Sequence, residues 1–205
     1  MPRPIYLTIT PDNTSSTGIC LSQTPGGAGA LTLNGALGTS FDYPRHIAIA
    51  SGSDISNRTF TIVGADISGR TLTEVVTGPN NATVKSTLYY KTLTSITISG
   101  SAAGAITVGT VGELSTQTIP LNYTMPIATQ VAVDVTGTIN FSVQETFDDP
   151  FTTLTPNWLS VTALASKAAD TNSQVSVGSR AIRVITNSYT NGATLGIDIV
   201  QVVCE

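Results

Sequence analysis

The chain has 205 residues, of which 40% are hydrophobic and only 11% are charged, against roughly 25% charged residues in an ordinary globular protein. Its formal net charge is −4 and its nine lysine and arginine residues are scattered, so it lacks the basic footprint of proteins that bind nucleic acid or anionic membranes. The sequence contains no apolar run of about 20 residues and no apolar core of a signal peptide, so we expect neither a membrane-spanning helix nor a leader.

The first 30 residues are rich in turn formers, and only the segment IYLTIT (5–10) alternates as a strand does. We therefore expect an irregular N-terminal arm over residues 1–30. Cys20 lies in this arm and Cys204 lies near the other end of the chain. A disulfide between them would close the molecule, but two cysteines do not make a secreted disulfide scaffold, so we favour two separate thiols.

From residue 46 onwards, short segments alternate between apolar and polar residues, at the spacing of about 8–12 residues that is typical of β-sandwiches and barrels. β-Branched residues dominate them, which suits a half-buried pleated surface. The predicted strands are 46–51, 59–64, 71–76, 94–99, 105–110, 131–137, 139–144, 174–179, 181–185 and 195–203.

Evidence for helices is thin. The best segment, TALASKAADT (162–171), has good helix formers but is short enough to be a crossover helix or only a loop. No alternation of strands and helices is present, which argues against a parallel nucleotide-binding sheet.

The two halves of the chain look like a repeat. Segments 104–111 and 192–200 align at an offset of about 88 residues, as a duplicated module would. We therefore predict an all-β protein of two tandem antiparallel β-sandwich modules, whose halves should superpose strand for strand. The modules would span 31–112 and 129–205. A linker over 113–128 would separate them, because two prolines there, Pro120 and Pro126, interrupt strand pairing. One large sandwich is the alternative.

His46 is the single histidine of the chain, so any histidine-based catalysis or metal binding would depend on it. It begins a predicted strand beside Arg45 and Asp42, and we interpret it as a solvent-exposed residue at a strand edge. The sequence contains none of the P-loop, GxSxG, HExxH or GxGxxG motifs in a suitable context.

The remaining candidates lie in the segment QETFDDPFTTLTPNW (144–158) and beside it. Asp148 and Asp149, with Glu145 nearby, could bind Ca²⁺ or act as an acid–base pair. Adjacent residues on an extended chain point in opposite directions, so a turn joining two strands is the simpler interpretation. Trp158 would anchor this segment onto a sheet or form an interface.

A carbohydrate platform would need several exposed aromatic side chains. The neighbours Tyr89 and Tyr90 cannot both face one side of a strand. The sequence thus assigns no catalytic, cofactor-binding or metal-binding residue, and we expect no enzyme and no cofactor.

Residues 62–97 carry a motif that resembles one in small β-rich virion proteins of tailed bacteriophages. In that motif a strand pair of the form I-x-G-x-D-x-x-G-x-x-x-x-E-x-V-x-G-P-N leads to Y-K-T-V-T-S-I-T. The matching residues are Ile62, Gly64, Asp66, Gly69, Glu74, Val76, Gly78, Pro79, Asn80 and the run Tyr90 to Thr97. The second half, with VDVTGTINFSVQETFDDPF, Trp158 and RAIRVITNS, resembles a module that accompanies this motif, and together the two cover residues 45–201.

The resemblance implies a non-enzymatic virion subunit that is assembled in the cytoplasm of a bacterial host. It would decorate or cement the capsid by bridging copies of the major capsid protein or other virion proteins. A neck, head–tail connector or tail-ring subunit is the first alternative, and a fibre or adhesin module that binds host glycans is the second. We expect a symmetric homo-oligomer within the particle, with no direct contact to nucleic acid or membrane.

Overall fold

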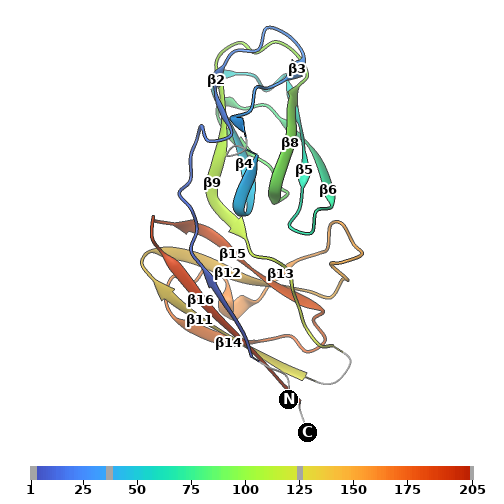
Figure 1. Ribbon diagram of the computed structural model, residues 1–205, viewed down its shortest axis with the longest axis vertical. Coiled ribbons are helices and arrows are strands. Elements are labelled where there is room, and N and C mark those ends of the chain that lie inside the picture. Colours follow the sequence, from blue (N-terminus) through green and yellow to red (C-terminus); the bar gives the residue numbers. More distant parts are fainter. Residues whose placement is uncertain (1–3, 36–38, 124–126, 204–205) are drawn as a thin grey trace. The chain divides into compact units, whose positions relative to one another are not determined.

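The computed structural model describes residues 4–35, 39–123 and 127–203. Almost all of its regular structure is antiparallel β-sheet, in two compact units (Figure 1). One unit, Thr14–Leu114, is called here the inserted sandwich. The other combines Met1–Asn13 with Ser115–Glu205, and is called the split sandwich because the inserted sandwich interrupts it in the sequence. Two β-sandwich modules are therefore confirmed, but the first lies within the second rather than simply before it.

The inserted sandwich contains eight strands in two sheets. They are β2 (Cys20–Gln23), β3 (Gly29–Ala30), β4 (Ser40–Asp54), β5 (Thr59–Ala65), β6 (Thr71–Thr77), β7 (Asn80–Lys85), β8 (Tyr90–Ile98) and β9 (Ile106–Ser115). One sheet has the order β2-β9-β4-β7 and the other has the order β3-β8-β5-β6. The first residues of the long strand β4 also pair with β8, which joins the two sheets at one corner.

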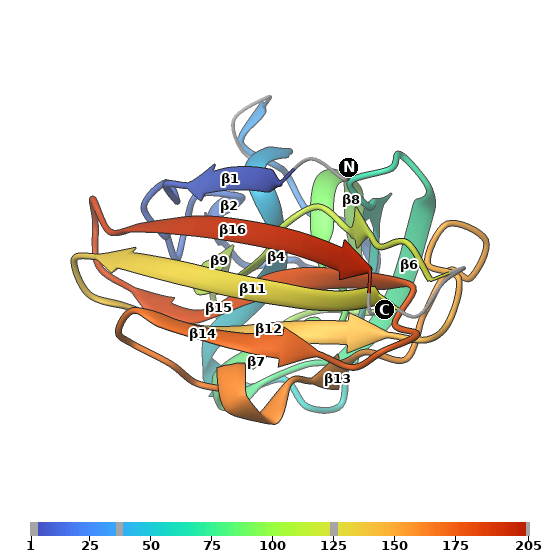
Figure 2. The same ribbon diagram turned by 90° about the horizontal axis from the view of Figure 1, so that it is seen from below.

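The split sandwich also contains eight strands. They are β1 (Ile5–Ile9), β10 (Ile119–Pro120), β11 (Ile127–Thr136), β12 (Ile139–Thr146), β13 (Leu159–Ser160), β14 (Thr171–Val175), β15 (Ala181–Tyr189) and β16 (Thr194–Val203). One sheet has the order β1-β16-β11-β14, whose strands lie side by side in Figure 2. The other has the order β10-β15-β12-β13.

The two sandwiches share one topology. When the strands of each are numbered from first to eighth, both have sheets ordered 1-8-3-6 and 2-7-4-5. The first strand pairs with the eighth, the second with the seventh, the third with the sixth and the fourth with the fifth. This is a jelly roll, in which a long antiparallel ribbon folds back over itself into two packed sheets. The eighth strands, Ile106–Ser115 and Thr194–Val203, keep the offset of about 88 residues that the sequence predicts for a duplicated module.

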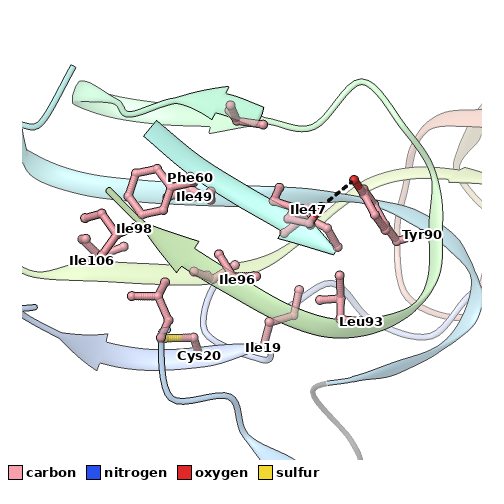
Figure 3. Close-up of a cluster of buried hydrophobic side chains, with 14 of the residues drawn as sticks. Ile19, Cys20, Ile47, Ile49, Phe60, Tyr90, Leu93, Ile96, Ile98 and Ile106 are labelled. Atoms are coloured by element: carbon pink, nitrogen blue, oxygen red, sulfur yellow. Dashed lines mark hydrogen bonds between the residues drawn. The ribbon is translucent and has the colours of Figure 1, made fainter. Parts of the chain in front are cut away.

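Alternation along the strands builds the core of each sandwich. In β5, the pattern places Phe60 and Ile62 inside and Thr59 outside. Figure 3 shows Phe60 among isoleucines of β4, β8 and β9, with Tyr90 at one side of the cluster. The hydroxyl of the fully buried Tyr90 lies 3.5 Å from the carbonyl oxygen of Ile62. The split sandwich has its own core, centred on buried side chains of β11, β12, β15 and β16.

The predicted N-terminal arm is irregular over much of residues 10–28, but it is not a separate arm, because three strands in it belong to the two sandwiches. Residues 5–9 form a strand of the split sandwich, and β2 and β3 belong to the inserted sandwich. The alternation of residues 5–10 indicates the strand β1, but not its partner β16, which is nearly the whole chain away. The strands β2 and β3 were missed because they are too short to show alternation. The predicted linker 113–128 contains the end of β9, the edge strand β10 and the beginning of β11. Pro120 fits there because β10 has a neighbour on one side only; Pro126 lies outside the described residues.

The segment 162–171 is not a crossover helix. It forms a single 3₁₀ turn over Thr162–Leu164, in which Leu164 is buried, and β14 begins at Thr171. The residues described contain no α-helix, and hence none long and apolar enough to cross a membrane.

Candidate interaction surface

His46 is buried, not exposed as the sequence suggested, with 8% of its surface accessible. Its Nδ1 lies 3.2 Å from the carbonyl oxygen of Leu88, and its ring stacks on Tyr89 with a centroid separation of 3.9 Å. Its Nε2 faces the Glu113 carboxylate at 3.7 Å, and that carboxylate also accepts hydrogen bonds from Lys85. The imidazole therefore joins β4 to the loop before β8, and its exposed area is small.

Burial lowers the pKa of His46 more than the nearby Glu113 carboxylate raises it. Its pKa is thus lower in the folded chain than in the unfolded chain, where it is about 6.5. As the pH falls through that value, the unfolded chain binds a proton more readily, so we expect the free energy of unfolding to decrease. Because His46 is the only histidine, the variant His46→Gln should remove this decrease. Urea unfolding of both proteins between pH 7.5 and 5 measures the difference, and identical pH profiles would contradict the prediction.

The acidic side chains near the end of β12 hold local structure. Glu145 is buried and accepts three hydrogen bonds, from the Ser176 amide, the Ser176 hydroxyl and the Ser179 hydroxyl, at 2.7–2.9 Å. Asp148 accepts from the amide of Asn157 at 2.6 Å. These bonds tie β12 to the turn after β14 and close the base of the next loop.

Asp149 begins a turn, as the sequence predicts for this pair of aspartates. Its Oδ1 accepts from the amide of Phe151 at 3.0 Å, and its backbone oxygen accepts from the amide of Thr153 at 2.9 Å. Its Oδ2 lies 3.5 Å from the guanidinium of Arg180. Among the described residues, no three His, Cys, Asp or Glu side chains gather as metal ligands would.

Trp158 lies at the end of this loop, against the sheet. The guanidinium of Arg183, on β15, lies 4.4 Å from the centroid of the indole ring, and its Nε donates to Gln144 on β12 at 2.8 Å. The tryptophan thus helps to fix the end of the loop, as the sequence analysis expects of it.

The segment that runs from the end of β12 to β13, held by the contacts of Asp148 and Trp158, exposes an unusual set of apolar side chains. We call residues 147–159 the β12–β13 loop. Four large apolar residues on it are between 45% and 55% exposed: Phe147, Phe151, Leu154 and Leu159. On a chain with so few charged residues, a concentration of exposed apolar side chains on one short segment is typical of a surface that contacts another molecule.

A small pocket of about 130 Å³ lies at the base of this loop. It is lined by Pro120, Leu121, Tyr123, Asp149, Pro150, Phe151 and Arg180. The guanidinium of Arg180 lies 4.6 Å above the ring of Tyr123 and donates to the hydroxyl of that residue at 3.0 Å. Arg180 is held in turn by its backbone, whose amide donates to Thr146 and whose carbonyl accepts from Leu121. These contacts hold Arg180 at the polar side of the pocket, and the prolines, Leu121 and Phe151 line its apolar side.

The sequence analysis missed Phe147, Phe151 and Leu154 as surface residues. A signal for them exists: these residues are separated by turn formers and do not alternate, so no sheet face is available to bury them. Tyr123 and Arg180 had no such signal, because they meet only when β10 pairs with β15.

The inserted sandwich presents a second uncharged surface, on the outer face of the sheet β3-β8-β5-β6. Thr59 lies opposite Thr77, Thr61 opposite Val75, and Val63 opposite Thr73. Ser95 and Thr97 of β8 continue the same rows. The rows named here offer hydroxyl and methyl groups.

Comparison with protein-family models and with curated proteins gives no match for the sequence. Among solved structures, the crystal structure of the major capsid protein P2 from Bacteriophage PM2 matches with a TM-score of 0.22 and 12% identity, over 99% of this chain and 98% of that chain. A TM-score of this size carries no argument about fold or function, so the assignment of the jelly rolls rests on strand pairing alone.

Proposed function

We propose that this chain is a non-enzymatic structural subunit of a tailed-phage particle, and that it decorates or cements the capsid by binding a neighbouring virion protein. The observation that carries the proposal is the β12–β13 loop, with its four exposed apolar side chains above a preformed pocket. Aromatic side chains beside a rigid pocket are the usual anchors of a protein–protein interface. The low charge of the chain agrees with a protein that works inside an assembly.

Two further observations support this role. The sequence motif over residues 62–97 resembles that of small tailed-phage virion proteins, and the jelly roll is a fold that viral capsid proteins use. The second argument is an analogy of fold, and a fold hosts many functions. The uncharged threonine face of the inserted sandwich offers additional weak contacts, which would be multiplied by the symmetry of a particle.

The test is a binding experiment with particles that lack this protein. The purified chain should bind to them and restore their resistance to heat. The double variant Phe147→Asp/Phe151→Asp should bind at least about 100-fold more weakly, because it removes two interface anchors and the loss of each costs about 2 kcal/mol or more. Val177→Asp is the matched control, since Val177 is equally exposed but lies on another loop of the split sandwich.

Three results would contradict parts of the proposal. Equal binding by the double variant and the control would exclude the β12–β13 loop as the contact. Particles that retain heat resistance without the protein but lack tails would favour the neck or tail-ring role. Hydrolysis or conversion of a small molecule by the purified chain would exclude a purely structural role.

The pocket also favours one second candidate, the binding of host glycans. An exposed tyrosine ring beside Arg180 and Asp149 combines a stacking platform with charged hydrogen-bonding groups. In this case Tyr123→Ala should abolish binding of the purified chain to the surface polysaccharide of the host, while binding to particles should remain.

A further inference from the structure

The strand β1 is placed unusually for a part of the split sandwich. It pairs with β16 in register from Ile5 opposite Ile199 to Ile9 opposite Leu195, at the edge of its sheet (Figure 2). The rest of the split sandwich begins only at Ser115, after the complete inserted sandwich. Hydrogen bonds and packing therefore hold β1 on its own sheet. The chain that connects β1 to the rest of that sheet passes through another folded unit, the inserted sandwich.

The place that β1 occupies is well defined. Ile9 is 2% exposed and Pro11 is buried, so the end of the segment fills an apolar site on the split sandwich. The hydroxyl of Tyr189, on β15, donates to the backbone oxygen of Asp12 at 2.6 Å. Tyr6 and Thr8 point outward, as the alternating burial of the strand shows.

The joint between the two sandwiches is short and exposed. Asp12 is the last residue that bonds to the split sandwich, and Ser15 is the first that bonds to the inserted sandwich. The backbone oxygen of Ser15 accepts a hydrogen bond from the Thr110 amide at 2.9 Å. Asn13 and Thr14 lie between them, are exposed, and span the division between the two units. A change of backbone angles at these two residues would redirect β1 and leave its place on the split sandwich open to an identical strand.

We propose that β1 is exchanged between copies of this chain, so that β1 of one copy pairs with β16 of a second copy. The contacts made are the same in both arrangements, so concentration and the hinge decide between them. Within one chain, the inserted sandwich tethers β1 to its own sheet, and we take the effective concentration of β1 there to be on the order of millimolar. Isolated chains at micromolar concentration therefore keep β1, whereas chains crowded at millimolar concentration exchange it.

Only the crowding in this inference rests on the proposed function, because a symmetric shell would bring copies of the chain to such local concentrations. Exchange of an edge strand would link neighbouring subunits through the same β1–β16 contact that each chain makes within itself, so no additional interface is needed. The partner is a second copy of this chain, and the site on it is the side of β16 that its own β1 leaves when it is exchanged.

Two variants with one added cysteine each test the exchange, Thr8→Cys and Gly196→Cys, both carrying Cys204→Ala. Thr8 and Gly196 lie directly opposite each other on the outer face of the sheet, at a spacing that a disulfide can bridge. A Cβ at Gly196 would make only ordinary contacts. The natural Cys20 can remain, because it is buried and burial raises the pKa of its thiol.

The two variants are unfolded together, refolded at about 1 mM or about 1 µM, and then oxidised. We expect a covalent heterodimer as a major product at the higher concentration and only a trace at the lower one. The pair Gln130→Cys and Val200→Cys is the matched control, since β11 and β16 pair within one continuous segment and their mixture should not cross-link. The double variant Thr8→Cys/Gly196→Cys should cross-link within one chain at about 1 µM, which checks the register.

A heterodimer yield at about 1 mM no greater than that of the control mixture would overturn the proposal. So would failure of the double variant to cross-link within the chain. The assay uses purified protein alone, so its outcome is separate from that of the particle-binding experiment.

Discussion

Replacing Asp42 with alanine is expected to lower the free energy of unfolding by about 3–5 kcal/mol. The guanidinium of Arg45 is buried, with 2% of its side chain exposed, and it makes two parallel bonds of 2.8 Å to the carboxylate of Asp42. Removing that carboxylate leaves a buried positive charge without its bidentate partner. The cost is large because a buried ion is far less well solvated than one in water.

Urea unfolding measures this loss, and two controls define its origin. Lys85→Ala removes a half-exposed partner of Glu113 and should cost less than about 1 kcal/mol, as surface ion pairs do. The double variant Asp42→Leu/Arg45→Met removes both charges and should recover most of the stability. A double variant no more stable than Asp42→Ala would show that the residues act through shape rather than charge.

Phe60→Ala should destabilise the inserted sandwich by a similar amount, about 3–5 kcal/mol. Phe60 is completely buried in the middle strand of its sheet, opposite Val76 on one side and Ile98 on the other (Figure 3). Truncation removes favourable burial and leaves a cavity that rigid neighbouring strands cannot close.

The adjacent variant Thr59→Ala is the matched control, because Thr59 is exposed on the outer face of the same strand. It should change the free energy of unfolding by no more than about 0.5 kcal/mol. Hydrogen exchange of amides in β5 and β8 locates the effect of Phe60→Ala. Equal effects of the two variants would mean that β5 is not in the register described.

Much of this fold could be predicted from the sequence, because long strands that bury one face must alternate. The segments around Ile62 and Ile197 show the pattern, and both lie in inner strands. Around Ile47 the sequence also alternates, but there β4 is buried on both faces. Short edge strands were not predicted. The strand β7 begins at Asn80, within what looks like a turn in the sequence, and β13 has only two residues. Two residues cannot show a period, and an edge strand needs little apolar surface.

The candidate site was predicted less well, for a different reason. His46 begins the predicted strand 46–51 and therefore looks exposed, yet it lies within the longer strand β4, where Tyr89 and the loop before β8 cover it. The pocket beside Tyr123 depends on Arg180, which is distant in the chain. Contacts of this kind follow from tertiary pairing, which alternation along one strand does not encode. Whether Cys20 pairs with Cys204 lies outside the described residues, since these end at residue 203.

The pairing of β1 with β16 sets an order of events during biosynthesis. When a ribosome makes this chain, the inserted sandwich is complete once Leu114 has emerged, and it can fold at once. The strand β1 must wait until Leu195–Ile199 has been made, about 190 residues later. For that whole interval the nascent chain carries an apolar β-strand with no partner of its own, so neighbouring nascent chains on the same messenger have an early opportunity to capture it.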